Sequence, residues 1–490
     1  MKRIQWIKWA ACAVAVLLLS GGCEKSKDNA DDTVLQNEFA LLLMSDVYLW
    51  NQEAISTYTS QNLSTDTEKD PIAFYEKLIY KDDSWSFMTD NVAYWDAIFS
   101  GTSTTFGYSL DFRRMSNNNV FAIVQFVYPG TPAEKAGIRR GDLLISMNGG
   151  AITVDNYRDM YMASSLKIGF GVYDADENAI RNSDRTPVTL TAVEMYEDPI
   201  LYHDIIEKGG KKIGYLLYTD YHLDVKPGDN QALLNLANVF SGFQNERVDE
   251  VILDLRYNGG GYAITSEFLC NILAPESAIN SKAVMTVQTW NKKYGAENNS
   301  STRFGNEVHF SHEGKQITVP VPVNMNLNRL YVLTSDGTAS ASESTIVGLK
   351  PYLDVILVGS RTSGKNCGGI LFDRGSYGST RNIEALRNWG AYTMVYKFTN
   401  KNNEVFVGGF VPQYAATEDI FNLVPFGDES DPLLAKVLEV ITGIPSQAGK
   451  ARAVTDHSRF MAIPNAQTRT NRLDGRMIDL RSPDEFKEIQ

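Results

Sequence analysis

Residues 336–343 read DGTASASE and lie just after the apolar run LYVLT at residues 330–334. The apolar run is typical of a buried strand, and the small residues after it allow a tight turn into a helix. Ser340 therefore stands at a strand-to-helix junction, the basic unit of an α/β layer. The partial positive charge of a helix N-terminus favours developing negative charge there, so the Ser340 hydroxyl is a candidate nucleophile.

A lysine follows 25 residues after Ser340, in the loop TSGK at residues 362–365. The loop comes after a second apolar run at residues 355–358, which predicts another buried strand. A lysine enclosed by apolar walls loses hydration of its charged form, so its pKa falls and it can accept a serine proton. Taken separately, such a serine is most often a helix N-cap and such a lysine a solvated charge. Their joint spacing instead favours a Ser340/Lys365 pair.

A glycine-rich turn ends a further apolar run, VILDLRYNGGG at residues 251–261. Consecutive glycines permit positive φ and close backbone approach, which exposes N–H groups to an anion. The glycines alone would indicate no more than a flexible turn. Asp254 and Arg256, just before it, are expected to fix the strand end through hydrogen bonds.

Residues 336–365 resemble the C-terminal processing, or tail-specific, serine peptidases, whose signature is a Ser-Ala-Ser-Glu element and a Gly-Lys loop at this spacing. Three serines compete for the nucleophile: Ser340, Ser342 and Ser344. Only Ser340 combines the family spacing to Lys365 with a glutamate three positions later. The resemblance therefore implies that Ser340 is the nucleophile and Lys365 the base.

The same resemblance implies an oxyanion hole formed by the backbone N–H groups of Gly260 and Ala341, with Gly259 or Gly261 as alternatives to Gly260. One such donor contributes about 3 kcal/mol to transition-state stabilisation. Glu343, one helical turn after Ser340, would face the same side and orient Lys365 or a substrate amide. Alternatively, Glu343 is simply an acidic residue in the first turn of a helix, where the helix dipole favours a negative charge.

Residues 120–149 contain a strand pattern followed by PGTPAEKAGI and RRGDLLISMNG, and they resemble a PDZ domain. We expect a short helix after Thr131, a helix C-cap at Gly137 and another strand after the turn at residues 141–142. PDZ domains add a peptide as an extra strand and capture its carboxylate on backbone N–H groups. By resemblance, that loop would consist of Phe106, Gly107, Tyr108, Ser109 and Leu110, although a Gly-aromatic strand start also occurs without a ligand.

The first residues predict export. Three cations within residues 2–8 precede an apolar stretch at residues 9–19 that is too short to span a bilayer well, so it reads as a secretion signal. The following SGGC resembles a bacterial lipoprotein signal, in which Cys23 is acylated; the alternative is a plain signal peptide with an incidental cysteine. The acidic tether that follows resembles a Bacteroidetes-type surface-export signal. These features predict a lipid anchor in the bacterial cell envelope, most simply at the outer membrane, periplasmic or surface-exposed.

Composition limits the partners. Hydrophobic residues at 43% and charged residues at 21% are ordinary for a globular protein. The formal charge of −13 becomes −16 without residues 1–22, which hold three cations and no acid, so nucleic acid is not an expected partner. The five histidines form no metal pattern, and no metal or organic cofactor is implied. Cys367 lacks a nearby histidine and is not expected to be a nucleophile; whether it pairs with Cys270 is left open.

Shifts in pattern divide the 490 residues. The expected segments are a lipoprotein signal peptide (1–22), a polar tether (23–32), an N-terminal helical domain (33–100), a PDZ-like domain (101–195), a serine peptidase core (200–444) and a polar, peripheral or disordered C-terminal tail (445–490). A β-hairpin region is expected within residues 280–327. Strands and helices alternate from residue 200, which predicts a multi-domain α/β protein. The family resemblance implies a layered core of the ClpP and crotonase type, with an inserted β-rich PDZ-like domain.

The predicted function is that of a serine endopeptidase of the C-terminal processing type, which cleaves unstructured or C-terminally recognised polypeptides. A competing hypothesis is a noncatalytic surface-exposed lipoprotein that uses the same fold to capture peptide, glycan or apolar ligands. A pure binder would not need Ser340, Lys365 and the glycine turn together. The sequence therefore favours the enzyme.

Overall fold

The computed structural model describes residues 31–445, except 116, 117, 227, 313 and 314, together with residues 460–463 and 476–479. The predicted signal peptide and the predicted lipidation site Cys23 lie outside the described residues. Within the described part of the chain, no helix is long and apolar enough to cross a membrane.

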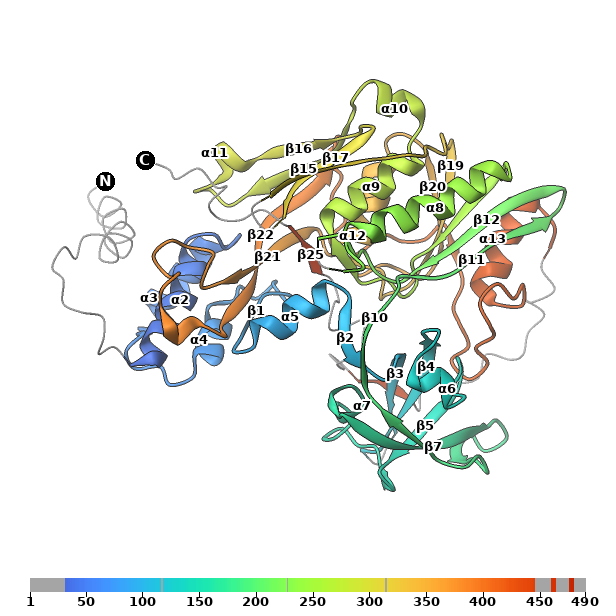
Figure 1. The fold of residues 1–490 in the computed structure, drawn as a ribbon, viewed down its shortest axis with the longest axis horizontal. Helices are drawn as coiled ribbons and strands as arrows, with labels where there is room; N and C mark the ends of the chain where they lie inside the picture. The colour runs from blue at the N-terminus through green and yellow to red at the C-terminus, as the bar shows by residue number, and fades with distance from the viewer. Residues whose placement is uncertain are drawn as a thin grey trace.

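A six-stranded sheet forms the core of the α/β part, on the right of Figure 1. Across this sheet, the first strand runs antiparallel to the second, and each later strand runs parallel to the one before it. In order across the sheet the strands are β11 (Ile200–Lys208), β12 (Lys211–Tyr218), β13 (Glu250–Asp254), β19 (Arg329–Thr334), β20 (Asp354–Gly359) and β23 (Tyr414–Ala415). The sheet confirms the predicted α/β core and the strands expected after residues 212, 251, 330 and 355.

Helices cover both faces of this sheet, which explains why β12, β13, β19 and β20 are mostly apolar and buried. Along β12, Leu216 and Tyr218 belong to one hydrophobic cluster, whereas Tyr215 and Leu217 belong to another. The first face packs against α8 (Gln231–Asn245), α9 (Ala263–Leu273) and α12 (Ala341–Leu349), and the second against α13 (Pro432–Thr442). Strand alternation thus divides the core into two layers.

A second, seven-stranded sheet lies beside the first. Its strands are β14 (Gly260–Tyr262), β25 (Arg476–Ile478), β21 (Cys367–Asp373), β22 (Gly390–Asn400), β15 (Val284–Trp290) and β16 (Ser300–Arg303), with β1 (Phe87–Thr89) paired to β22. The expected hairpin between residues 280 and 327 is present as the antiparallel pair β17 (Glu307–His312) and β18 (Lys315–Pro320).

Between residues 31 and 100, which the structure describes, there are four helices, as the periodicity predicted: α2 (Asp32–Ser45), α3 (Asn51–Ser60), α4 (Pro71–Leu78) and α5 (Val92–Phe99). Asp70 caps α4 by accepting from the Ile72 and Ala73 backbone N–H groups, and Pro71 occupies the first turn, where its missing N–H costs nothing. Apolar side chains of these helices, such as Phe39 and Phe74, share one cluster with Tyr392 of β22. The helical region is therefore continuous with the core.

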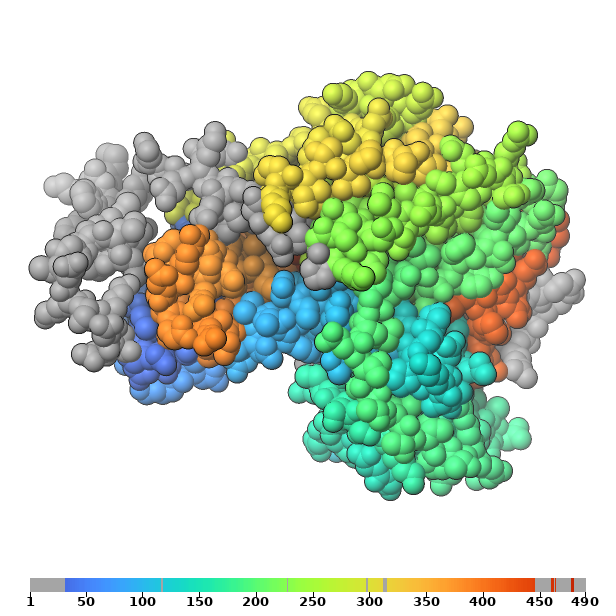
Figure 2. Space-filling model, viewed as in Figure 1, coloured from blue at the N-terminus to red at the C-terminus, as the bar shows by residue number. Residues whose placement is uncertain are grey.

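Residues 106–191, called the PDZ lobe here, have their own sheet and their own hydrophobic cluster. They project as a separate lobe in the space-filling view (Figure 2). Thr131 caps the expected short helix, and Gly137 adopts positive φ just after it. The lobe contains the following elements: β3 (Tyr108–Arg114), β4 (Val120–Val127), α6 (Pro132–Lys135), β5 (Leu143–Met147), β6 (Gly150–Ala151), α7 (Asp159–Met162), β7 (Ser165–Asp174), β8 (Ala179–Asn182) and β9 (Val188–Thr191). The short pair β2 (Thr102–Thr105) and β10 (Val193–Tyr196) connects it to the rest.

The C-terminal residues depart from expectation. Two described pieces form strands: β24 (Met461–Ala462) pairs with β3 of the PDZ lobe, and β25 pairs with both β14 and β21. Met477 and Ile478 are buried. The expectation of a peripheral or disordered tail is therefore wrong for residues 476–478, because this short run is enclosed between two strands of the core.

Candidate active site

Ser340 lies at the end of the turn between β19 and α12, where the chain adopts φ 59° and ψ −109°. Positive φ is unfavourable for a residue with a side chain, and such strain is often found where a reactive group must be presented. A sharp strand-to-helix turn of this kind aims a nucleophilic hydroxyl away from the helix. The Ser340 side chain is fully buried, and among the described residues its Oγ has no hydrogen-bond partner. Ser342 and Ser344, by contrast, lie within α12.

Glu343 joins the Ser340 turn to the Lys365 loop. One carboxylate oxygen accepts from the backbone N–H groups of Ser340 (3.0 Å) and Lys365 (2.8 Å). The other accepts from the Gly364 N–H (2.7 Å) and the Thr362 hydroxyl (2.6 Å). Burial raises the pKa of the Glu343 carboxyl to about 7, although these hydrogen bonds act to lower it. Glu343 thus holds the backbone of the lysine loop, whereas the sequence suggested contact with the lysine side chain or substrate.

The shared carboxylate brings distant parts of the sequence together. Two hydrogen bonds of 3.0 and 2.8 Å to one oxygen keep the backbone nitrogens of Ser340 and Lys365 within about 6 Å of each other. A further bond of 3.0 Å, from the Ser363 N–H to the Thr338 carbonyl, ties the same two loops. The two residues expected to pair are therefore neighbours in space.

Lys365 is fully buried. Its Nζ lies 5.4 Å from the ring centres of both Trp85 and Tyr392. The two rings exclude water from the amine, so they form the apolar enclosing walls that were expected from the sequence. Tyr392 comes from β22 and Trp85 from the segment before β1, and no local pattern in the sequence marked either as part of the site.

The glycine turn lies against the Ser340 turn. The Asn258 carbonyl accepts from the Ala339 N–H (3.2 Å) and from the Ser342 hydroxyl (3.1 Å). The Gly260 N–H, which the sequence assigned to the oxyanion, donates instead to the Asn258 side-chain oxygen at 2.9 Å. Gly259, the alternative one residue earlier, lies at the same turn. Ala341 is the first residue of α12, where a backbone N–H has no partner within the helix.

Asp254 and Arg256 belong to a buried ionic cluster. The Arg256 guanidinium contacts Asp254 at 2.8 Å and Asp431 at 2.7 Å, and Glu418 at 2.8 Å. Arg140 of the PDZ lobe also reaches Glu418. This cluster fixes the strand end before the glycine turn and connects it to the PDZ lobe, which is a structural role.

The two thiols of the described chain, Cys270 and Cys367, are both buried and unpaired with each other. Burial raises the pKa of the Cys367 thiol to about 12, so the thiol stays protonated at neutral pH. Because the thiolate is the nucleophilic form, Cys367 is not suited to nucleophilic attack.

The predicted carboxylate loop of the PDZ lobe is folded inward. All five residues from Phe106 to Leu110 are buried. The Gly107 N–H donates to Thr105 Oγ1 at 3.0 Å, and the Leu110 N–H donates to the Tyr161 hydroxyl at 2.8 Å. These two N–H groups are thus already engaged within the lobe.

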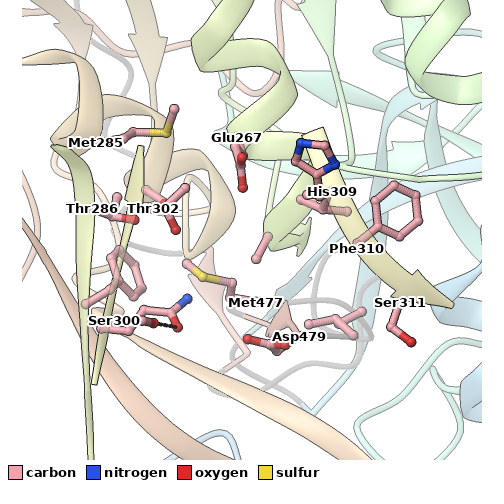
Figure 3. A pocket seen from close by; sticks show the side chains of 16 residues that line it. Glu267, Met285, Thr286, Ser300, Thr302, His309, Phe310, Ser311, Met477 and Asp479 are labelled. Carbon is pink, nitrogen blue, oxygen red and sulfur yellow. Dashed lines mark hydrogen bonds between the residues drawn. The ribbon is translucent and has the colours of Figure 1, made fainter. Parts of the chain in front are cut away.

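A cavity of about 200 Å³ lies beside the second sheet (Figure 3). Its lining brings together Glu267 of α9, His309 of the hairpin, Ser344 of α12 and Asp479 after β25. Burial raises the pKa of the Glu267 carboxyl to about 8. A polar cavity next to α12 offers space for part of a bound ligand.

Replacing Glu267 with glutamine is expected to stabilise the protein at alkaline pH. Burial raises the pKa of Glu267 from 4.5 to about 8 in the folded protein. Its contribution to the free energy of unfolding is therefore fully present below pH 4.5 and is lost as the pH rises through about 8. The amide carries no such penalty, so we expect a gain of about 1 to 2 kcal/mol in unfolding free energy near pH 9 and none near pH 5, after allowing for partial exposure. Urea unfolding at both pH values measures this, with the exposed Glu276→Gln as control; equal gains at both would contradict the assignment.

Replacing Glu343 with glutamine is expected to loosen the site. Its amide nitrogen would face two donors that now share one accepting oxygen. Leaving buried donors without acceptors costs about 1 to 3 kcal/mol each, so we expect a loss of about 2 to 4 kcal/mol in unfolding free energy. Urea titration checks the value against Glu53→Gln on the exposed surface of α3. A Glu343→Gln protein as stable as this control would show that the carboxylate does not tie the loops.

Together, the α/β layered core, the strained serine turn, the enclosed lysine and the PDZ lobe define a class of PDZ-containing serine peptidases. Residues 212–387 match peptidase family S41, and residues 123–165 match a PDZ domain. The chain thus contains an S41 peptidase domain and a PDZ domain, and these matches support a C-terminal processing peptidase family.

Known proteins align with most of the chain. It is 22% identical to a carboxyl-terminal-processing protease of Synechocystis sp. over 66% of each chain, and 24% identical to one of Picosynechococcus sp. over 64% of this chain and 65% of that one. The chain thus spans just under two thirds of the length of these relatives. The crystal structure of an S41-type protein of Bacteroides fragilis is similar with a TM-score of 0.66 and 25% identity, over 83% of this chain and 98% of that one. The photosystem II D1 C-terminal processing protease shares the fold at a TM-score of 0.50 and 19% identity, over 86% and 99%.

Proposed function

We propose that the protein is a serine endopeptidase that cleaves unstructured or C-terminally recognised polypeptides with a Ser340/Lys365 dyad. The observation that carries the proposal is the shared Glu343 carboxylate, which holds the strained Ser340 turn beside the buried Lys365 loop. Similarity to the C-terminal processing peptidases supports the same reaction. A polypeptide binder without chemistry has no need of a strained serine beside an enclosed lysine.

In the proposed mechanism, the Ser340 oxygen attacks the carbonyl carbon of the scissile bond while the uncharged Lys365 amine accepts the hydroxyl proton. The backbone N–H groups of Ala341 and of the glycine turn stabilise the negatively charged oxygen. Because the Gly260 N–H already donates to Asn258, we assign this second role to Gly259. Lys365 then returns the proton to the leaving amine, which breaks the carbon–nitrogen bond and leaves an ester on Ser340. Water hydrolyses that ester with Lys365 again as base.

The proposed substrates enter as extended chains, because a β-sheet protein can add such a segment as a strand without unfolding itself. The PDZ-like domain, which we assign to residues 101–195, would recruit them to the core at residues 200–444. Since the Gly107 and Leu110 N–H groups are engaged inside the lobe, recruitment through Phe106–Leu110 requires that loop to open.

We also propose that the protein is anchored to the bacterial cell envelope through a lipid on Cys23. The cationic start, the short apolar stretch and the small residues before Cys23 support this location, as does the polar tether after it. Treating cells with an inhibitor of lipoprotein signal cleavage should retain residues 1–22 on the wild-type protein.

The most direct functional test compares a disordered polypeptide with a tightly folded one as substrates for the purified protein. The proposal predicts peptide products from the disordered chain only, and no products from the Lys365→Ala protein. Undegraded disordered chain bound tightly by the wild-type protein would instead favour the noncatalytic capture of peptides.

A further inference from the structure

A short strand from the C-terminal part of the chain, β25, lies in the second sheet between its edge strand β14 and β21. β25 runs parallel to β14, with Arg476 opposite Gly260, Met477 opposite Gly261 and Ile478 opposite Tyr262. On its other side Ile478 pairs with Gly369 of β21, and the Asp479 N–H donates to the Gly369 carbonyl at 3.0 Å. In Figure 1, β25 lies near the middle of the molecule, beside β21 and α12.

The two strands beside β25 both extend from the candidate active site. β14 begins one residue after Gly259, and β21 begins two residues after Lys365. Since β25 is parallel to both, its first residue, Arg476, lies at the end nearest the glycine turn. The strand therefore begins next to the glycine turn and runs between the two strands that lead away from the proposed site.

The contacts of β25 resemble those of a specifically bound peptide. Met477 and Ile478 are 2% and 5% exposed, although they lie in a polar part of the sequence. The Tyr392 hydroxyl donates to the Met477 carbonyl at 2.8 Å, and the Tyr396 hydroxyl contacts the Met477 sulfur at 3.5 Å. The Tyr392 ring also lies 5.4 Å from Lys365 Nζ, so one side chain contacts both the strand and the proposed base.

Residues 460–462, which also belong to the C-terminal part of the chain, contact the PDZ lobe. Met461 and Ala462 pair antiparallel with Arg114 and Arg113 of β3. Phe460 is buried in a cluster of the PDZ lobe, with its ring 5.4 Å from that of Phe121. Residues 460–462 and 476–479 thus contact the PDZ lobe and the peptidase core, respectively. These are the two units to which the proposed function assigns the binding of a polypeptide substrate.

We propose that residues 476–479 are a built-in ligand of the substrate groove, which a substrate must displace before it is cleaved. This inference rests on the proposed function and deepens it. The groove between β14 and β21 takes an extended polypeptide as a parallel strand, and the burial of both Met477 and Ile478 selects substrates with two consecutive apolar residues. The chain's own C-terminal stretch competes for that groove.

Tethering makes such competition effective even for a weak ligand. Strand addition relies on backbone hydrogen bonds, which any extended peptide offers, so intrinsic affinity is modest. A tethered segment nevertheless acts at an effective concentration of about 1 mM, and one that binds with a dissociation constant of about 0.1 mM would raise the apparent KM about tenfold. Since the competition concerns binding alone, kcat should stay unchanged.

The kinetic test compares three proteins with the wild type on one disordered substrate. We expect a chain that ends at residue 473, and the full-length Met477→Glu protein, to lower KM about tenfold at unchanged kcat, because a buried charge expels the strand from its groove. The full-length Met461→Glu protein is the matched control, since Met461 lies in the same C-terminal stretch but is 57% exposed. Wild-type KM in both the shortened chain and Met477→Glu would overturn the proposal.

A binding test separates this inference from the enzymatic proposal, because it needs no catalysis. The shortened chain carrying Ser340→Ala is titrated into a fluorescent peptide with the sequence of residues 474–490, and anisotropy is recorded. We expect saturable binding that is lost when the peptide carries Met477→Glu. Binding without any cleavage by the active chain would reject the proposed function but keep the groove assignment. Absence of binding to a shortened chain that still melts cooperatively would reject the built-in ligand.

Discussion

Replacing Ser340 with alanine is expected to lower kcat/KM for a disordered polypeptide by about 10⁴- to 10⁶-fold, which is the range for loss of a serine nucleophile. The hydroxyl is the only group lost, and Oγ has no hydrogen-bond partner among the described residues. The substitution should therefore leave the thermal unfolding midpoint within a few degrees of the wild type. Initial rates from a quenched-fluorescence peptide and a melting curve measure both effects.

Ser344→Ala is the matched control for this prediction. Ser344 lies on the same helix, one turn after Ser340, and lines the cavity beside the second sheet. We expect its kcat to remain within about threefold of the wild type, since a group outside the reacting atoms contributes little to the barrier. Full activity in Ser340→Ala, or its loss in Ser344→Ala alone, would move the nucleophile to another serine.

Replacing Lys365 with methionine is expected to reduce kcat by about 10³- to 10⁴-fold with a smaller effect on KM, because general base catalysis contributes mainly in the transition state. Methionine keeps the length and apolar character of the side chain, so it can remain between Trp85 and Tyr392. Steady-state kinetics with the same fluorescent peptide gives kcat and KM separately.

Lys397→Met controls for the loss of a positive charge next to an aromatic ring. Lys397 is exposed on β22, and its Nζ lies 5.5 Å from the Trp50 ring. We expect it to change kcat by less than about twofold, since exposed charges have little influence on a buried reaction. If Lys365→Met keeps wild-type kcat, the base must be another group.

Local sequence was sufficient to predict the strands and to select the candidate pair Ser340 and Lys365, whose backbones the structure brings close together. The apolar runs at β13, β19 and β20 are buried on both faces, so they read clearly as strands of a covered sheet. Ser340 was chosen over Ser342 and Ser344 because only Ser340 has the family spacing to Lys365 and a glutamate three positions later, and of the three serines only Ser340 has positive φ.

Several parts of the site depend on contacts that no local pattern encodes. Trp85 lies near Lys365 although it comes from the N-terminal region, because β1 pairs with β22 and the Met394 N–H of β22 donates to the Ser86 hydroxyl. The position of β25 is decided by Met477 and Ile478, two apolar residues in a polar stretch that is too short for a recognisable period. The engaged N–H of Gly260 depends on one side-chain rotamer of Asn258. Pattern reading detects periodic burial and cannot detect single contacts of this kind.

The central claim is that Ser340 forms a covalent ester with its substrate because Lys365 removes its proton. The most direct measurement is a rapid acid quench of the protein with an activated peptide ester, followed by peptide mapping in a mass spectrometer. An acyl group on the peptide that contains Ser340, absent from Ser340→Ala and strongly reduced in Lys365→Met, is the predicted result. An acyl group on Ser342, Ser344 or Cys367, or an equal yield in Lys365→Met, would contradict the claim.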